Sequence, residues 1–271
     1  ITFGDYAIVL KPRHNIAHYD AFDWIMENLN QMAKALADTE MLKSDFISNV
    51  SHEIKTPLAI IQNYATALLH SEMSMEQRKK SAQILVDTSN KLTHMVMNIL
   101  KLNKLEHQAI LLEKKVVFVN QILENAILQF EKEIEEKQLQ LICDFEDIRL
   151  KTVEAYLEII LNNLISNAVK FTDQKGIITL RLYTQNNQLI FSIADTGWGM
   201  SQDTGNHIFE KFYQGDTSHK REGNGLGLAL VKKIVRVHGG SVSAVNTEDG
   251  LIEFTVNLPA KRSCERCCGS N

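Results

Sequence analysis

The sequence predicts a multidomain chain in which an all-α antiparallel helical hairpin, expected to form a dimeric four-helix bundle, precedes an α+β sandwich. Apolar residues recur at helical spacing over about 50 residues, from Tyr19 to His70, and a second helical pattern continues to Leu105. Beyond Leu105 the pattern changes to short alternating strands mixed with shorter helices. A length of 271 residues accommodates two or three such domains, and a hydrophobic content of 44% suffices for packed cores.

The first helix is predicted from apolar residues three or four positions apart. No glycine or proline interrupts it before Pro57, whose missing backbone donor should bend the helix there. At about 1.5 Å per residue the helix would be about 75 Å long, which is typical of a coiled coil or a helical bundle. The apolar stripe consists of Phe22, Ile25, Leu29, Met32, Leu36, Leu42, Phe46, Val50, Ile61, Ala65 and Leu68.

A polar turn at residues 71–74 is expected to lead into the second helix. This helix has a heptad seam with one polar position, formed by Ala82, Leu85, Ser89, Leu92, Val96 and Ile99. Each helix of an antiparallel pair has one face for burial, so two hairpins in a homodimer would enclose a shared core. A hairpin that packs on its own downstream domain is the alternative.

The remainder of the chain predicts a mixed sheet with helices on one face. The strands at 178–183 and 189–194 should pair as a hairpin across residues 185–187, and the last two strands should join through Asp249 and Gly250. Cys143 lies in an alternating strand and is expected in the core. Strands are predicted at 116–119, 139–145, 178–183, 189–194, 241–246 and 252–258, and helices at 120–136, 154–170 and 226–238.

Composition excludes several classes of protein. A net charge of −4 argues against a dedicated nucleic-acid binder. The chain has no run of about 18 apolar residues, so this piece is not expected to span a membrane, and its start at Ile1 suggests a fragment or a processed product. Cys264, Cys267 and Cys268 lie close together in the final segment, and two cysteines spaced C-x-x-C could be half a zinc site. No second pair accompanies them, so a disordered tail is favoured.

His52 lies in the first helix, on the side away from the apolar stripe. At about 100° per residue it is about 200° from Val50 around the helix axis. Glu53 is its immediate neighbour, and Pro57 follows one turn later. An exposed histidine beside an acid is usually solvated surface, so its importance depends on three segments of the second domain.

The first of these segments is the helix at about 154–170. Asn163 and Asn167 are four residues apart, so they lie on one helix face, and Lys170 follows. Amide oxygens suit a hard cation and an ammonium group suits phosphate, although a solvated polar face explains the same residues.

The second segment ends a strand with Asp195, Gly197 and Gly199. The glycines allow a tight turn and close approach to a flat ligand, and the carboxylate can accept a hydrogen bond from an exocyclic amine. A plain turn would explain the glycines equally well.

The third segment, with Gly223, Gly225 and Gly227 around Leu226, opens the helix at 226–238. Glycine-rich backbone before a helix N-terminus favours an anion such as phosphate, but the spacing matches neither a P-loop nor a dinucleotide fingerprint. The aperiodic stretch between residues 200 and 222, which contains Phe209 and Phe212, is interpreted as a lid over a ligand.

In this order the segments closely resemble the bacterial sensor histidine kinases of two-component systems. The resemblance covers about residues 40–259 and includes Ser51-His52-Glu53 with Pro57-Leu58, the Asn-rich helix, Asp-x-Gly-x-Gly, Phe-x-x-Phe and Gly-x-Gly-x-Gly. Residues 1–40 resemble the latter part of a HAMP linker, with Gly4-Asp5-Tyr6 at the end of its first helix. The expected domains are therefore a partial HAMP linker at 1–40, a dimerisation and phosphotransfer hairpin at 41–106, an ATP-binding domain at 107–260 and a tail at 261–271.

The resemblance implies specific roles in the hairpin. It implies that His52 accepts a phosphoryl group from ATP, that Glu53 orients or deprotonates His52, and that Thr56 helps to place water when the phosphate of a response regulator is hydrolysed. Pro57 would allow the helices to rearrange.

The resemblance also implies a nucleotide site that uses ATP and magnesium. Asn167 matches the magnesium-binding position with Asn163 beside it, Lys170 matches the phosphate-binding lysine, and Asp195 matches the adenine-reading carboxylate. The other matched positions are Phe171, Gly197, Gly199, the lid residues Phe209 and Phe212, and the loop residues Gly223, Gly225, Leu226 and Gly227. Phe171, Asn224 and Val153 depart from the Tyr, Thr and Asp that are common in the family.

The implied protein is the cytoplasmic portion of a homodimeric membrane sensor whose membrane segments lie outside this chain. It would autophosphorylate, transfer the phosphoryl group to an aspartate of a response regulator, and act as that regulator's phosphatase. Two alternatives are a scaffold or phosphatase-only signalling module and a relative of the chaperone and mismatch-repair ATPases. The latter proteins lack the helix that carries His52.

Overall fold

The computed structural model describes residues 21–69, 73–107, 113–197, 199–214, 225–247 and 249–260. The chain forms two compact units that divide between Leu92 and Thr93. The sequence-based predictions for residues 1–20, including Gly4-Asp5-Tyr6, and for the three tail cysteines lie outside the described residues.

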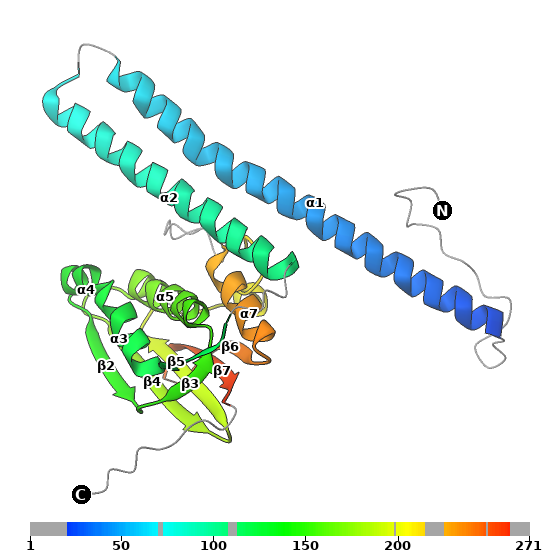
Figure 1. The fold of residues 1–271 in the computed structure, drawn as a ribbon. Coiled ribbons are helices and arrows are strands. Elements are labelled where there is room, and N and C mark those ends of the chain that lie inside the picture. Colours follow the sequence, from blue (N-terminus) through cyan, green and yellow to red (C-terminus); the bar gives the residue numbers. More distant parts are fainter. Residues whose placement is uncertain are drawn as a thin grey trace, which may run out of the picture. The chain divides into compact units, whose positions relative to one another are not determined.

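Two long helices form the N-terminal part of the chain (Figure 1). α1 spans Ala21–Leu68 and α2 spans Met75–His107. α2 begins with a reciprocal cap: the Gln77 amide donates to Ser74 Oγ at 3.2 Å, and the Ser74 amide donates to Gln77 Oε1 at 2.9 Å. This cap satisfies two donors at the helix start and fixes where the turn ends.

α1 continues through Pro57 without an interruption of the helix (Figure 1). The bend of the helix axis at Pro57 stays a prediction. A proline removes one backbone donor, and a helix of 48 residues keeps its hydrogen-bond ladder on both sides of that position.

The buried face of α2 differs from the predicted seam by one residue. The buried positions recur every seven residues at Ser81, Thr88, Met95 and Leu102. Among the predicted seam residues, Ala82, Ser89 and Val96 are exposed, whereas Leu85, Leu92 and Ile99 are half-buried. An apolar pattern gives the period of a helix but does not distinguish a face buried within one chain from a face available to a second copy.

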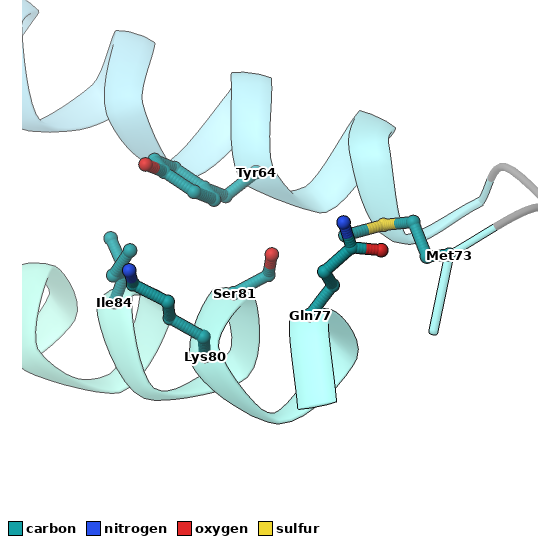
Figure 2. Close-up of a pocket in the computed structure, with 6 residues that line it drawn as sticks. All are labelled: Tyr64, Met73, Gln77, Lys80, Ser81 and Ile84. Atoms are coloured by element: carbon teal, nitrogen blue, oxygen red, sulfur yellow. The ribbon is translucent and has the colours of Figure 1, made fainter. Parts of the chain in front are cut away.

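A hollow of about 310 Å³ lies between the two helices near their turn. Tyr64 of α1 points into it from one side, and Ser81 and Ile84 of α2 line the other (Figure 2). Met73, Gln77 and Lys80 complete the lining. None of the predicted site residues of α1 contributes to this hollow.

The second unit contains a five-stranded mixed sheet in the order β2-β4-β5-β7-β6. β2 pairs with β4 in parallel, and all other neighbours are antiparallel. The strands are β2 (Gln140–Phe145), β4 (Ile177–Gln185), β5 (Gln188–Asp195), β6 (Ser241–Asn246) and β7 (Ile252–Pro259). The predicted hairpin of β4 and β5 is confirmed, with Asn186 and Asn187 at φ of 52° and 59° in a two-residue turn.

The helices of this unit lie on one face of the sheet, as predicted (Figure 1). α5 (Glu154–Phe171) packs between α3 (Val119–Leu128) and α7 (Gly227–Val237). The core consists of apolar side chains from the helices and from the inward positions of the central strands: Leu123, Leu157, Leu161, Leu164, Leu230, Ile234, Leu180, Leu182, Phe191, Ile193 and Val256.

Three local predictions for this unit need correction. The helix predicted at 120–136 is two helices, α3 and α4 (Glu131–Lys137), because the backbone leaves the helical region at Phe130, with φ −109° and ψ 10°. Cys143 is exposed and not in the core, because β2 is the edge strand of the sheet. The strand predicted at 116–119 is β1 (Lys115–Phe118), and Val119 already belongs to α3.

Two short elements were not predicted from the sequence. β3 (Arg149–Thr152) pairs with β1 in a separate two-stranded sheet, and α6 (Gln202–His207) lies in the stretch interpreted as aperiodic. β3 has four residues and α6 has six, so both are too short for a periodic pattern to emerge. Across the described ranges, no helix is both long and apolar enough to cross a membrane.

Candidate functional site

The first group of predicted site residues lies within one turn of α1, with His52 and Thr56 on the same helix face. His52 and Thr56 are exposed, and Glu53 is half-buried. The Thr56 hydroxyl donates to the His52 carbonyl oxygen at 3.3 Å, one helical turn away. The imidazole, the carboxylate and the hydroxyl thus come from neighbouring positions of one helix, which places them together without any tertiary contact.

The second group centres on Asp195, the last residue of β5. Its side chain is buried, with 2% exposure. The Gly197 amide donates to Asp195 Oδ1 at 2.9 Å, and the Thr172 side chain is a second partner. Burial raises the pKa of Asp195 from 3.8 to about 6, although these two hydrogen bonds lower it in part. Burial makes the ionised form of this carboxyl group unfavourable, and a hydrogen bond donated by a ligand would stabilise that form.

The turn after Asp195 requires glycine at position 197. A Cβ there would lie 2.5 Å from Asp195 Oδ1 and 3.2 Å from the Phe171 carbonyl oxygen. Gly199 has φ of +79°, which favours glycine. The turn therefore packs directly against the C-terminal end of α5.

An asparagine of β6 anchors the segment that follows this turn. Asn246 Nδ2 donates to the Met200 carbonyl oxygen at 2.6 Å, and the Met200 amide donates to Asn246 Oδ1 at 2.9 Å. Sequence reasoning missed Asn246, because a contact across 46 positions leaves no local pattern. It also missed Thr172, a fully buried polar residue whose position beside Phe171 was the only signal.

The C-terminal half of α5 carries the predicted cation and phosphate ligands. Asn163 and Asn167 are both half-buried, and the Asn163 Nδ2 group donates to the Ile159 carbonyl oxygen at 2.7 Å. Its Oδ1 atom is thereby directed away from its own helix backbone. Lys170 is half-buried, and its Nζ lies 4.8 Å from the ring centre of Phe171, which is 41% exposed.

Asn163 meets the start of α7. A Cβ on Gly227 would overlap Asn163 Oδ1, so the absence of a side chain at Gly227 permits this approach. Leu226, the residue before the helix, is fully buried. The N-cap residue of α7 is thus an apolar leucine, and the N-terminus of a helix favours an anion.

The described part of the predicted lid is attached to the domain at Met200, through Asn246, and again near its other end at Phe209 and Phe212. Phe209 packs edge-to-face on Phe254 of β7, with ring centres 6.4 Å apart, so it lies against the sheet. Phe212 has φ of +64°, and its amide donates to the Gly225 carbonyl oxygen at 2.9 Å. Residues 215–224, which include the predicted loop residue Gly223 and Asn224, lie outside the described residues.

Three elements far apart in the sequence therefore converge: the end of β5, the C-terminal half of α5 and the start of α7. Thr172 contacts Asp195, Phe171 contacts the turn at Gly197, and Asn163 contacts Gly227. The donor set suits a nucleotide with a hard divalent cation, since it offers a buried carboxylate, amide oxygens, an ammonium group and a helix N-terminus.

Two protein-family models match the chain. The model described as His Kinase A (phospho-acceptor) domain matches residues 42–108. The model described as Histidine kinase-, DNA gyrase B-, and HSP90-like ATPase matches residues 152–262. The first match distinguishes the chain from the chaperone and mismatch-repair ATPases, which were the alternative for its second domain.

Curated relatives are similar over nearly the whole chain. The heme sensor protein HssS of Staphylococcus epidermidis is 30% identical over 260 residues, which are 95% of this chain and 55% of that protein. HssS of Staphylococcus aureus strain Newman is 30% identical over 94% of this chain and 54% of its own length. The chain thus spans about half the length of the curated relatives it matches.

Solved structures support the predicted fold class. The Acinetobacter baumannii histidine kinase AdeS matches with a TM-score of 0.65 and 21% identity, over 78% of this chain and 98% of that chain. Full-length ShkA in complex with AMPPNP matches with a TM-score of 0.59 and 28% identity, over 82% and 46% of the two chains. ThkA in complex with the response regulator TrrA has a TM-score of 0.68 and 21% identity, over 83% and 64%. A helical hairpin followed by an α+β sandwich is therefore confirmed.

Proposed function

The chain belongs to the sensor histidine kinases of two-component systems, and we propose that it transfers the γ-phosphoryl group of ATP to His52. The domains that would act are those predicted from the sequence, a dimerisation and phosphotransfer hairpin at 41–106 and an ATP-binding domain at 107–260. A partial HAMP linker at 1–40 would connect them to membrane segments outside this chain, so the chain would be the cytoplasmic portion of a membrane protein.

The convergence of α5, β5 and α7 around Asp195 carries this proposal. The buried Asp195 would accept a hydrogen bond from the exocyclic amine of adenine, and Gly197 and Gly199 would leave room for the flat ring. The start of α7, with Gly225, Leu226 and Gly227, would lie on the phosphate side, together with Lys170. Phe209 and Phe212 would border the nucleotide from the lid.

The donor set of α5 fits a magnesium ion bound together with the ATP phosphates. Asn167 would hold it, with Asn163 beside it, since amide oxygens are ligands that magnesium accepts. When bound, the ion would neutralise charge on the phosphoryl group that is transferred. Catalysis would then depend on positioning and electrostatics.

At the hairpin, one imidazole nitrogen of His52 would attack the γ-phosphorus as the bond to the β-γ bridging oxygen breaks and ADP leaves. Glu53 would orient the ring and accept the proton of the imidazole. The phosphoryl group would then pass to an aspartate carboxylate of a response regulator, which regenerates neutral His52. Thr56 would position water for the reverse signal, the hydrolysis of the regulator's phosphate.

Two solved relatives support parts of this proposal, because ShkA was crystallised with AMPPNP and ThkA with the response regulator TrrA. The match to the phosphoacceptor domain model supports a homodimer. HssS is named a heme sensor, and the proposal for this chain concerns phosphoryl transfer alone.

The test is labelling of the purified chain with γ-³²P-ATP and magnesium. We expect acid-labile, base-stable label in the wild type and none in His52→Gln. His94→Gln is the matched control, because His94 is an exposed histidine of α2. Undiminished labelling of His52→Gln would contradict the assignment of the phosphoacceptor, and absence of labelling in the wild type would contradict the kinase.

A further inference from the structure

Lys137, the last residue of α4, makes an unusual set of contacts that the proposed mechanism does not use. Its Nζ donates to the carbonyl oxygens of Val169 at 2.6 Å, Lys170 at 2.9 Å and Thr172 at 2.9 Å. All three acceptors lie at or just beyond the C-terminal end of α5, the helix that carries the predicted cation and phosphate ligands. The side chain of Lys137 is half-buried between the two elements.

The chemistry of a helix end explains why an ammonium group lies here. The last carbonyl oxygens of a helix have no amide partner within the helix, and the helix dipole places partial negative charge at this end. An ammonium group has three donors and no acceptor, and three carbonyl oxygens match this set completely. Lys137 therefore acts as a cationic C-cap supplied by another helix.

Backbone hydrogen bonds join the same two segments. The Lys175 amide donates to the Lys137 carbonyl oxygen at 2.9 Å, and the Gln140 amide donates to the Gly176 carbonyl oxygen at 2.9 Å. Gln138, directly after Lys137, has φ of 54°, which turns the chain from α4 toward β2. The segment between α4 and β2 is therefore hydrogen-bonded to the segment between α5 and β4 at several positions.

The segment between α5 and β4 is also a wall of the candidate nucleotide site. Thr172 is a hydrogen-bond partner of Asp195, and the Phe171 carbonyl oxygen lies 3.2 Å from the Cβ position of Gly197. A shift of the α5 terminus would therefore move the partner of Asp195 and the backbone beneath the turn at Gly197. Lys137 contacts the backbone carbonyl oxygens of Val169, Lys170 and Thr172, so it can influence the site through this stretch of backbone.

We propose that Lys137 is a positioning residue for the nucleotide, whose contacts with the end of α5 hold Thr172 and Lys170 where adenine and phosphate are bound. This inference rests on the proposed function as an ATP-dependent kinase. Because Lys137 fixes groups that would contact ATP before and during the reaction, its loss should weaken ground-state and transition-state binding alike.

The experiment compares Lys137→Met with wild type in the full chain. We expect the KM for ATP in autophosphorylation, and the Kd for ADP measured by calorimetry, to rise about tenfold, with kcat within about twofold of wild type. Lys137→Arg should restore most of the affinity, because a guanidinium also donates to several carbonyl oxygens. Lys132→Met is the matched control, since Lys132 lies on the same helix with 84% side-chain exposure and should leave KM unchanged.

A purely structural role would give a different result. It would lower the thermal midpoint and the active fraction of Lys137→Met, seen as a reduced kcat at an unchanged KM, and this outcome would overturn the proposal. If Lys137→Met does not fold, Lys137→Gln replaces it in the comparison with Lys137→Arg, and equal KM values in these two variants and wild type would also overturn it. Failure of the wild type to bind ADP would instead contradict the proposed kinase.

Discussion

The two candidate sites of this chain are built in opposite ways. On α1, His52, Glu53 and Thr56 lie within one helical turn, and His52 and Thr56 are exposed on the same face. In the second unit, Asp195 is 2% exposed and its partners are Gly197 and Thr172, the residue that follows α5, while Asn163 of α5 contacts α7. The role proposed for His52 requires that a nucleotide domain and a partner protein can reach its side chain, which exposure permits. A group that selects a small ligand benefits from burial, where its hydrogen bonds are stronger.

The largest expected effect is at Asp195, where one substitution should weaken nucleotide binding and at the same time increase the stability of the protein. Asp195→Asn should weaken nucleotide binding about 100-fold, because the charged acceptor is lost. The same variant should be more stable than wild type without nucleotide at pH 7.5, by up to about 3 kcal/mol, since burial raises the Asp195 pKa from 3.8 to about 6. ADP calorimetry and urea unfolding measure the two effects. Loss of both affinity and stability would place Asp195 in a structural role.

The pH dependence of binding sharpens the same point. A carboxyl with a folded pKa of about 6 and an unfolded pKa near 3.8 binds more protons when folded, so its contribution to stability falls as pH rises from about 4 to 6. Affinity for adenosine, which carries no phosphate that titrates there, should fall as pH drops below about 6 because the acceptor is neutralised. The difference in affinity between wild type and Asp195→Asn should therefore shrink below that pH. A constant difference down to pH 4.5 would contradict this explanation.

A substitution at the start of α7 tests whether the buried site depends on contacts between elements. Gly227→Ala should displace Asn163 Oδ1 and raise the Kd for the ATP–magnesium complex about tenfold. Gly205→Ala in α6 is the matched control, because a Cβ there meets no atom within 4 Å among the described residues. Unchanged binding in Gly227→Ala would mean that the contact between Asn163 and Gly227 has no role in nucleotide binding.

A substitution at the exposed site on α1 should change one reaction only, because its side chains do not depend on contacts between distant elements. Thr56→Ala should preserve autophosphorylation and the thermal midpoint while slowing dephosphorylation of a cognate regulator about tenfold. Thr66→Ala is a close control, since Thr66 is also exposed on α1 and its hydroxyl donates to Gln62 at 2.8 Å in the same manner. Equal losses of the kinase and phosphatase reactions in Thr56→Ala would exclude this specific role.

The last prediction, with the smallest expected effect on the single chain, concerns the exposed face of α2 that carries Ala82, Ser89 and Val96. If a second hairpin packs there, Val96→Glu should shift the sedimentation of the full chain from dimer to monomer, whereas His94→Glu should not. Val96 is 39% exposed in the single chain, so the substitution disturbs little within it. A dimer that persists in Val96→Glu would place the interface on another face.

The sequence by itself determined the features that depend on neighbouring residues. The period of α1 and α2, the turn at Asn186 and Asn187, and the adjacency of His52, Glu53 and Thr56 all follow from local spacing and local backbone preference. Its motifs also indicated that Asn163, Asn167, Asp195 and the glycines belong to one site, through resemblance to a family and not through geometry.

Only the tertiary structure decided which face of α2 is buried, that Cys143 lies on an edge strand, and that the helix at 120–136 breaks at Phe130. It also decided the burial of Asp195, the approach of Asn163 to Gly227, and the contact of Lys137 with the end of α5. The physical reason is the same in each case. These properties are set by packing and hydrogen bonds between segments that are distant in the chain, and a local pattern contains no information about which distant segment it will meet.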